Sequence, residues 1–151
     1  MANKYLGKRF LEEVWNEGKR ETIAELVATD CVVHDAGGDA VGPDGFYPFY
    51  DRMRASLSDV KLVVEDLLED GDRICVRWSC SATHTGDGLG MPATNKPYLV
   101  TGITIMRVRD GQFVEAWQNW DMYAMLTQIG VVPGPTTTYI GAAATSWAPG
   151  P

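Results

Sequence analysis

Asp121 is a carboxylate that could transfer a proton. Asn119 and Trp117 precede it at intervals of two residues, at the end of an apolar segment. If this segment is a strand, alternation puts the three side chains on one face. A carboxylate that an indole shields from water keeps its proton to higher pH, which suits a general acid or base. Asp121 also precedes the last helical segment, where Asp is a favoured N-cap, and the two roles are compatible.

The two histidines are the other candidates for acid–base chemistry near neutral pH. His34 ends a short apolar segment, and either its side chain or that of Asp35 faces inward, because neighbours on a strand point to opposite faces. His84 ends a longer segment and shares a face with Trp78, so it could hold a carbonyl or ester oxygen at a pocket mouth. The alternatives are a surface histidine at position 34 and a histidine that orders the following loop at position 84.

Neither histidine belongs to a metal motif, since no H-x-x-x-H or H-E spacing occurs. The cysteines, Cys31, Cys75 and Cys80, are odd in number and lack C-x-x-C spacing. Cys75 and Cys80 would lie about 16 Å apart along one strand, too far for a disulfide. We therefore expect reduced, mostly buried thiols and no metal site.

The composition limits the classes of partner. The 151 residues suit one domain, and the 45% hydrophobic and 22% charged content is that of a globular protein. The net charge of −7 disfavours nucleic acid and anionic membranes. No apolar run reaches the roughly 18 residues of a membrane span, and the N-terminus lacks the apolar stretch of a signal peptide. We expect a cytoplasmic protein.

The hydrophobic periodicity predicts an α+β fold, with three N-terminal helices followed by a curved antiparallel meander. Helices are expected around residues 6–15, over 21–28, from near Tyr47 to 57, and over 122–129. The third helix is expected to start near Tyr47 because Pro48 suits a first turn. Strands are expected over residues 31–34, 60–68, 73–85, 98–109 and 113–120, with hairpins at Asp70-Gly71 and Asp110-Gly111. Such a bent sheet on helices encloses a cone-shaped central pocket.

Aromatic residues are the candidates to line this pocket. Trp117 and Trp120 point to opposite faces of their strand, so at most one of them lines it. Tyr50 and Met53 on the third helix would cap it from the other side, unless they are plain core. The glycine-rich loop over residues 86–97 could serve as a lid, or be an ordinary connection.

Short motifs along the chain resemble the SnoaL-like polyketide cyclase (ester cyclase) family of the nuclear-transport-factor-2-like superfamily, over about residues 5–130. The motifs that carry the resemblance are Val14-Trp15-Asn16-Glu17-Gly18, Gly42-Pro43-Asp44-Gly45, Gly71-Asp72-Arg73, Arg77-Trp78, Thr83-His84-Thr85-Gly86, residues 102–108, Asp110-Gly111, Glu115-Ala116-Trp117, Asp121 and Gln128-Ile129-Gly130.

The resemblance implies a cone-like α+β barrel that dimerises through its sheet, without metal or organic cofactor. It also implies an acidic residue for proton transfer at the end of the last strand, which matches Asp121. Two departures stand out. Thr104 occupies a position where the cyclases carry histidine. Trp78 and Cys80 lie on the strand where the epoxide-hydrolase relatives place an Arg and an Asp.

These observations favour a cofactor-independent enzyme that performs an intramolecular aldol closure on a hydrophobic carbonyl compound. The alternatives are an epoxide hydrolase or isomerase and a non-catalytic binding protein. The predicted catalytic residues are Asp121, His34 and His84. The predicted substrate-binding residues are Trp78, Asn119, Trp117, Asp35, Thr104, Tyr50 and Met53.

The outer face of the predicted sheet is apolar as well, which favours a homodimer through the sheet. We expect Ile103, Ile105 and Trp120 to point outward, and Thr104 to point inward. The domain is expected to span residues 1–130. A Pro/Gly-rich tail over residues 131–151 follows, which either stays flexible or lies across the partner.

Overall fold

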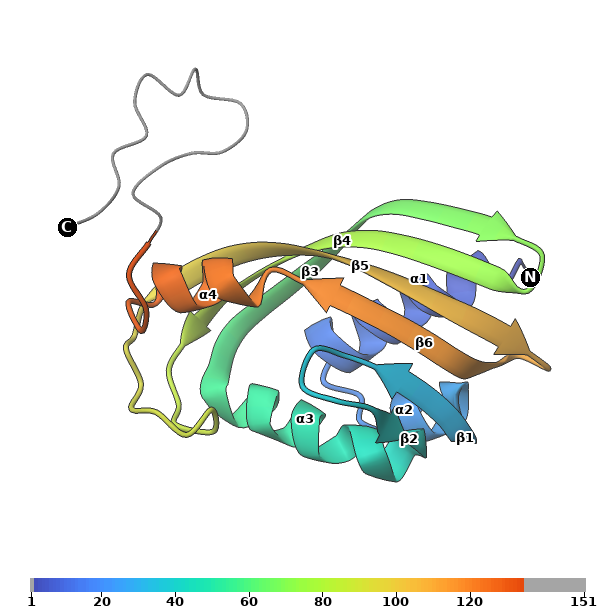
Figure 1. The fold of residues 1–151 in the computed structure, drawn as a ribbon, viewed down its shortest axis with the longest axis horizontal. Coiled ribbons are helices and arrows are strands. Elements are labelled where there is room, and N and C mark those ends of the chain that lie inside the picture. Colours follow the sequence, from blue (N-terminus) through green and yellow to red (C-terminus); the bar gives the residue numbers. More distant parts are fainter. Residues whose placement is uncertain (1, 135–151) are drawn as a thin grey trace, which may run out of the picture.

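A computed structural model describes residues 2–134, which form one curved six-stranded sheet with helices against its concave face (Figure 1). The helices are α1 (Lys4–Leu11), a π-helical continuation η1 (Glu12–Asn16), α2 (Glu21–Leu26), α3 (Gly42–Ser56) and α4 (Met122–Gln128). The strands are β1 (Val27–His34), β2 (Ala40–Val41), β3 (Leu57–Asp70), β4 (Arg73–His84), β5 (Pro97–Arg109) and β6 (Gln112–Trp120). The predicted α+β class and curved sheet are confirmed.

The strands lie in the order β2-β1-β6-β5-β4-β3. Strands β3 to β6 form the predicted antiparallel meander, and β1 joins its edge parallel to β6. At the β5–β6 hairpin Asp110 and Gly111 both take positive φ, as a two-residue hairpin of the predicted kind requires.

Two predicted boundaries are wrong. Strand β1 begins at Val27, where the backbone turns extended and pairs with Phe113, so the second helix ends before residue 28. Helix α3 begins at Gly42, because Gly42 adopts a left-handed conformation and Pro43 fills the first turn. Pro48 therefore lies inside the helix, where it cannot donate to the Asp44 carbonyl.

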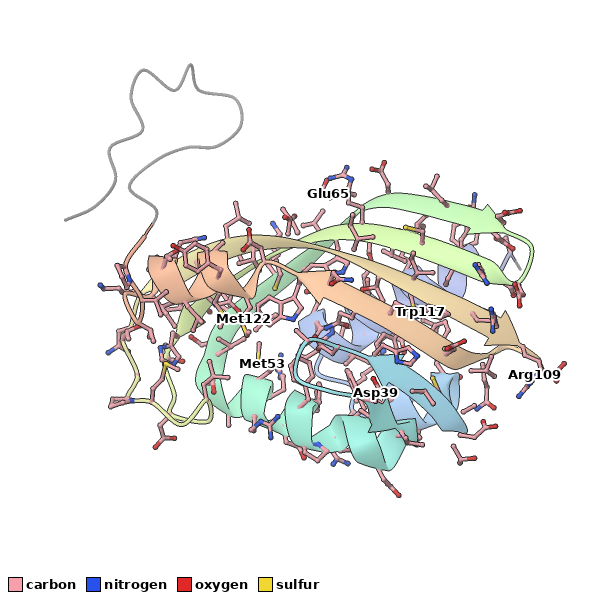
Figure 2. All side chains as sticks on the ribbon, in the orientation of Figure 1. Asp39, Met53, Glu65, Arg109, Trp117 and Met122 are labelled. Carbon is pink, nitrogen blue, oxygen red and sulfur yellow. The ribbon has the colours of Figure 1, made fainter. Side chains whose placement is uncertain are left out.

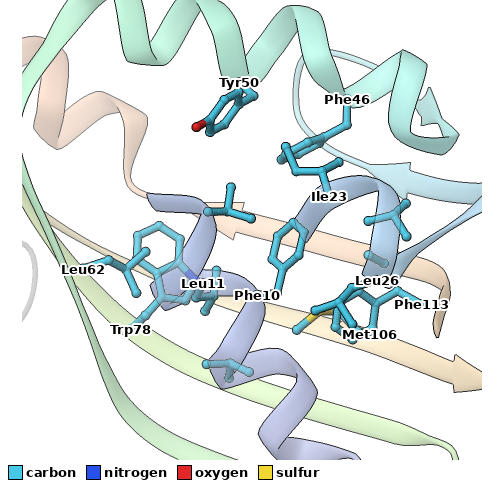
Figure 3. Packing of buried hydrophobic residues seen from close by; sticks show 14 of the residues in the cluster. Phe10, Leu11, Ile23, Leu26, Phe46, Tyr50, Leu62, Trp78, Met106 and Phe113 are labelled. Carbon is cyan, nitrogen blue, oxygen red and sulfur yellow. The ribbon is translucent and has the colours of Figure 1, made fainter. Parts of the chain in front are cut away.

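The core lies between the helices and the concave face of the sheet (Figure 3). Phe10 of α1 packs edge-on against Phe113 of β6, with ring centroids 5.6 Å apart, and also contacts Phe46 of α3. Gly102 of β5 is part of this packing, because a Cβ atom there would overlap the Trp78 indole. The sheet and three helices thus close over a common apolar layer.

The two faces of β5 alternate strictly. Val100, Thr104 and Met106 are buried, whereas Ile103 and Ile105 are 48% and 39% exposed. The predicted directions of Ile103, Ile105 and Thr104 are thus confirmed.

Trp120 pairs with Gly102 and lines the concave side, so its predicted outward direction is wrong. The predicted tail, residues 131–151, falls almost wholly outside the described residues. Within residues 2–134 no helix combines the length and apolar character that crossing a membrane requires.

Candidate functional site

An apolar chamber of about 50 Å³ lies between the concave face of the sheet and helices α1, η1 and α3. Its lining contains no charged side chain and consists of Leu11, Trp15, Phe49, Met53, Leu57, Val60, Leu62, Trp78, Cys80, Tyr98, Val100, Gln118 and Trp120. Trp78 and Met53 therefore lie where the sequence predicted. This chamber is suited to an uncharged, apolar group.

A wider vestibule of about 260 Å³ adjoins the chamber and shares Phe49, Met53, Gln118 and Trp120 with it. It lies between α3, α4 and the segment after β1. Figure 2 labels Met53 on α3 and Met122 on α4 at this opening. The vestibule adds two charged side chains to the lining, Asp35 and Arg52.

At the end of β1 either His34 or Asp35 was expected to face inward. The residue that does so is Asp35, because it borders the vestibule and His34 does not. Asp35 is half-buried, and its Oδ1 accepts a hydrogen bond from the Ala36 backbone N–H at 2.6 Å. Arg52 is exposed and forms no ion pair with any residue in the described range. The vestibule thus brings one carboxylate and one available cation to the mouth of an apolar chamber.

Asp121 lies on the other side of the sheet. Its exposed carboxylate accepts a hydrogen bond from the Ala124 N–H at 2.8 Å and caps α4, as the N-cap alternative predicted. It borders a shallow hollow on the convex face together with Arg77 and Ile103. The predicted placement of Asp121 beside an indole in the pocket is therefore wrong.

The cause is the register of β6 against β5. Trp117 pairs with Ile105 and Asn119 with Ile103, so both share the convex face that Asp121 continues. The common face was predicted correctly, but the pocket is on the opposite side. Asn119 lies at the rim and lines both the vestibule and the convex hollow, whereas Trp117 borders neither.

His34 belongs to a charged network on the convex face. Its Nε2 lies 3.1 Å from a Glu115 oxygen and its Nδ1 lies 3.0 Å from an Asp39 oxygen. The hydrogen bond to Glu115, and then that to Asp39, hold the pKa of His34 above its usual range. The ring stacks on Trp117 with centroids 5.6 Å apart. His34 is thus the surface histidine of the alternative prediction, and its placement in the pocket is wrong.

His84 shares the concave face with Trp78, as predicted, but its fully buried ring lines neither the chamber nor the vestibule. Its Nδ1 accepts from the Thr94 N–H at 3.3 Å and lies 3.1 Å from Thr94 Oγ1. Because Nδ1 accepts, Nε2 is the nitrogen that carries a proton, and it has no partner among residues 2–134. His84 therefore orders the loop after β4, which was the alternative prediction.

Two predicted binding residues are structural instead. Tyr50 is buried against Trp15, with ring centroids 5.5 Å apart, and does not line the chamber. Thr104 Oγ1 accepts a hydrogen bond from the Trp78 Nε1–H at 3.1 Å, which fixes the orientation of the indole. Beside Thr104, on the next strand, the residue that points inward is Gln118.

Three further residues that line the two cavities were not predicted: Gln118, Tyr98 and Arg52. The signal for Gln118 was its position two residues before Trp120, once Trp120 is known to face inward. Tyr98 shares the buried face of β5 with Val100, two residues further on, and burial raises the pKa of its phenol. Burial likewise raises the pKa of the neighbouring Cys80 thiol to about 11. Neither group changes charge near neutral pH.

The three cysteines are unpaired, as predicted. No three His, Cys, Asp or Glu side chains in the described part of the chain gather closely enough to hold a metal ion.

Comparison with known proteins places this chain in a family. The sequence profile of the SnoaL-like polyketide cyclase family matches residues 6–129. No curated protein matches the chain. IdmH from Streptomyces antibioticus, a proposed polyketide cyclase, is 30% identical with a TM-score of 0.73, covering 87% of this chain and 100% of its own.

Two further solved structures are similar. A proposed polyketide cyclase from Acidithiobacillus ferrooxidans is 27% identical with a TM-score of 0.75, over 85% of this chain and 94% of its own. AclR from Streptomyces galilaeus, a proposed hydroxylase, is 22% identical with a TM-score of 0.78, over 88% and 83%, and shows the shared fold alone. Since the family profile spans most of the chain, this protein belongs to the SnoaL-like polyketide cyclase family.

Proposed function

We propose that the chain is a polyketide cyclase-like enzyme that closes a ring in a hydrophobic compound with several carbonyl groups, using Asp35 as its acid–base group. The observation that carries this proposal is that Asp35 is the one carboxylate among the described residues that line the chamber and vestibule. The sheet separates Asp121 from both cavities. We therefore assign to Asp35 the acid–base role that the sequence predicted for Asp121.

The dimensions of the two cavities support a small substrate that spans both. Ligand sites usually occupy about 300–1,000 Å³. The chamber of about 50 Å³ is too small alone, whereas the vestibule of about 260 Å³ continues it past Phe49 and Met53. An apolar portion would enter the chamber, and the reacting carbonyl groups would stay beside Asp35.

In the proposed reaction the Asp35 carboxylate removes a proton from a carbon between two carbonyl groups. The enolate carbon attacks a second carbonyl carbon of the same molecule, and a carbon–carbon bond forms as the carbonyl π bond opens to an alkoxide. The alkoxide takes the proton back from Asp35. The protein contributes the folded conformation of the substrate and the base.

Arg52 and Asn119 supply the polar contacts of this proposal. Both line the vestibule with Asp35, and Arg52 has no carboxylate partner among residues 2–134. A guanidinium beside the enolate oxygen would stabilise the negative charge that develops there. Asn119, at the rim, would hydrogen-bond a second oxygen.

The test compares two aspartates on opposite sides of the sheet. Ring closure of a panel of aryl triketones is followed by ultraviolet absorbance. Asp35→Asn should lower turnover at least about 100-fold, while Asp121→Asn should leave it unchanged, because Asn retains the helix cap. Full activity in Asp35→Asn, or loss in Asp121→Asn alone, would contradict the proposal.

A non-catalytic binding protein is the second candidate. It is favoured by the chamber lining, in which the only titratable groups are Cys80 and Tyr98, and burial raises the pKa of both. Native mass spectrometry of the purified protein distinguishes the two functions. A retained ligand that stays chemically unchanged, and whose affinity survives Asp35→Asn, would favour binding over catalysis.

We also propose a homodimer through the convex face. Leu99, Ile103 and Ile105 expose 59%, 48% and 39% of their surface on this one side of β5. A two-fold axis would cover these residues with the same residues of a second copy. Light scattering should give twice the 16.6 kDa chain mass, and Ile105→Lys should halve it. A mass near 16.6 kDa at all concentrations would exclude the dimer.

A further inference from the structure

Tyr98 is the polar side chain in the chamber that packing does not explain. The residue is 5% exposed, and its ring lines the chamber beside Cys80 and Val100. Its hydroxyl makes no hydrogen bond to any residue of the described range. Tyr50 is buried to the same degree, but only Tyr98 lines the chamber, so only the Tyr98 hydroxyl is placed to bond a molecule held there.

The protonation state of Tyr98 defines what its hydroxyl can do. Burial, and then the neighbouring Cys80, raise the pKa of the phenol, so it stays neutral at physiological pH. A neutral phenol donates one hydrogen bond and can accept others. Its natural complement is an uncharged oxygen, such as a carbonyl or hydroxyl, on a molecule that fills the chamber.

Gln118 presents a second uncommitted polar group. Its side chain lines both the chamber and the vestibule, and its amide has no hydrogen-bond partner among residues 2–134. Gln118 pairs with Thr104, which follows Tyr98 by six residues on β5. At about 3.3 Å per residue, the Cα atoms of Tyr98 and Gln118 are up to about 20 Å apart along the strand direction, and the two side chains span part of that distance.

The chamber lining between Tyr98 and Gln118 is largely apolar. Trp78, Val100 and Trp120 face the same cavity, and the indole N–H of Trp78 is already bonded to Thr104.

We propose that the chamber and the vestibule together select an elongated, mostly apolar ligand with one neutral oxygen at its buried end, bound by Tyr98, and a second neutral oxygen near the vestibule, bound by Gln118. This inference rests on the proposed function and narrows its substrate class. Tyr98 and Gln118 are specificity residues here, and neither takes part in the proton transfer assigned to Asp35.

The test uses three probes with the same apolar body: biphenyl, 4-hydroxybiphenyl and 4,4′-dihydroxybiphenyl. Affinity is measured by equilibrium dialysis. Each hydroxyl that finds a protein partner should tighten binding about 2- to 10-fold, so the wild-type protein should show two successive gains. Tyr98→Phe should show one gain, Gln118→Leu one gain, and the double variant none.

Tyr50→Phe is the matched control, because Tyr50 is equally buried but does not line the chamber. It should keep both gains. Three outcomes would overturn the proposal. The probes do not bind, the hydroxyl groups give no gain in the wild type, or Tyr98→Phe and Tyr50→Phe change the affinities alike.

Binding and turnover are measured separately, so the two proposals fail in different ways. If the wild-type protein shows two affinity gains but no variant has catalytic activity, the roles of Tyr98 and Gln118 in binding would be supported and the proposed enzymatic function would be rejected. If turnover depends on Asp35 but affinity does not depend on Tyr98 or Gln118, the enzymatic function would be supported and the binding roles of these two residues would be rejected.

Discussion

The two faces of the sheet are built by the same strands and carry opposite chemistry. On the concave face Trp78, Tyr98 and Gln118 enclose a chamber without a charged side chain. On the convex face His34 and Glu115 join an ion-pair network that continues to Arg107 and Asp72. Residue types that usually mark a catalytic site therefore gather on the face without the chamber, whereas Asp35, the acid–base group that we propose, lines the vestibule.

The difference between the faces predicts unequal costs for removing their tryptophans. Trp78 is 7% exposed on the concave face, so Trp78→Ala should lower the free energy of unfolding by about 3–5 kcal/mol. Trp117 contacts His34 and Arg107 on the convex face, so Trp117→Ala should cost roughly 1 kcal/mol when both variants are compared in an Ile105→Lys background, which keeps the chain monomeric. Urea unfolding measures both. Equal losses would mean that the convex face is buried in solution as deeply as the core.

A smaller effect is expected where β5 lies under the Trp78 indole. Gly102→Ala places a methyl group against the ring and should cost about 1–3 kcal/mol, since the indole must move and weaken its bond to Thr104. Thr101→Ala, one residue away on the exposed face, should stay within about 0.5 kcal/mol. If both variants unfold at the same urea concentration, the chamber wall is looser than the packing indicates.

The sequence was sufficient for the class of fold, the hairpins and the alternation of Ile103, Thr104 and Ile105. It was not sufficient for the side on which the pocket lies. Alternation fixes which residues share a face, but both faces of β5 and β6 contain apolar residues, so the pattern cannot say which face the helices cover.

The misplacement of Asp121, Trp117 and His34 follows from that single ambiguity. Asp35 follows the end of β1, where its inward direction depends on the parallel pairing of β1 with β6. This pairing joins segments about 80 residues apart in the chain, and no local sequence pattern indicates it. Tyr98 and Gln118 line the chamber but are neutral, so neither carries the acid–base signal that an Asp, Glu or His residue gives in a sequence.

The cap of α4 offers a test on the rim between the faces. Asp121→Ala removes the acceptor for the Ala124 N–H and should cost about 0.5–2 kcal/mol. Asp121→Asn should cost much less, since an Asn side chain also caps. Thermal unfolding of the two variants distinguishes loss of the cap from loss of the charge. A larger loss for Asn than for Ala would assign Asp121 a role that capping does not explain.

The smallest expected effect is the dependence of stability on pH through His34. Contacts with Glu115 and then Asp39 raise the pKa of His34 in the folded protein above its ordinary value of 6.5. The folded protein therefore binds the His34 proton more tightly than the unfolded chain does. This contribution is fully present below about pH 6.5 and disappears as pH rises through the higher folded pKa. Unfolding measured from about pH 5 to 9 should show this decline.

Variants of the network identify its source. His34→Gln should remove the part of the pH dependence that lies in this window. Glu115→Gln should reduce it more than Asp39→Asn, because the bond to Glu115 is the larger cause of the raised pKa. Glu115 also accepts a hydrogen bond from Arg107 Nη1 at 3.1 Å, so its loss leaves a pH-independent deficit that Asp39→Asn does not produce. A His34→Gln protein with the wild-type pH profile would show that the convex network stabilises the fold through packing on Trp117 and not through charge.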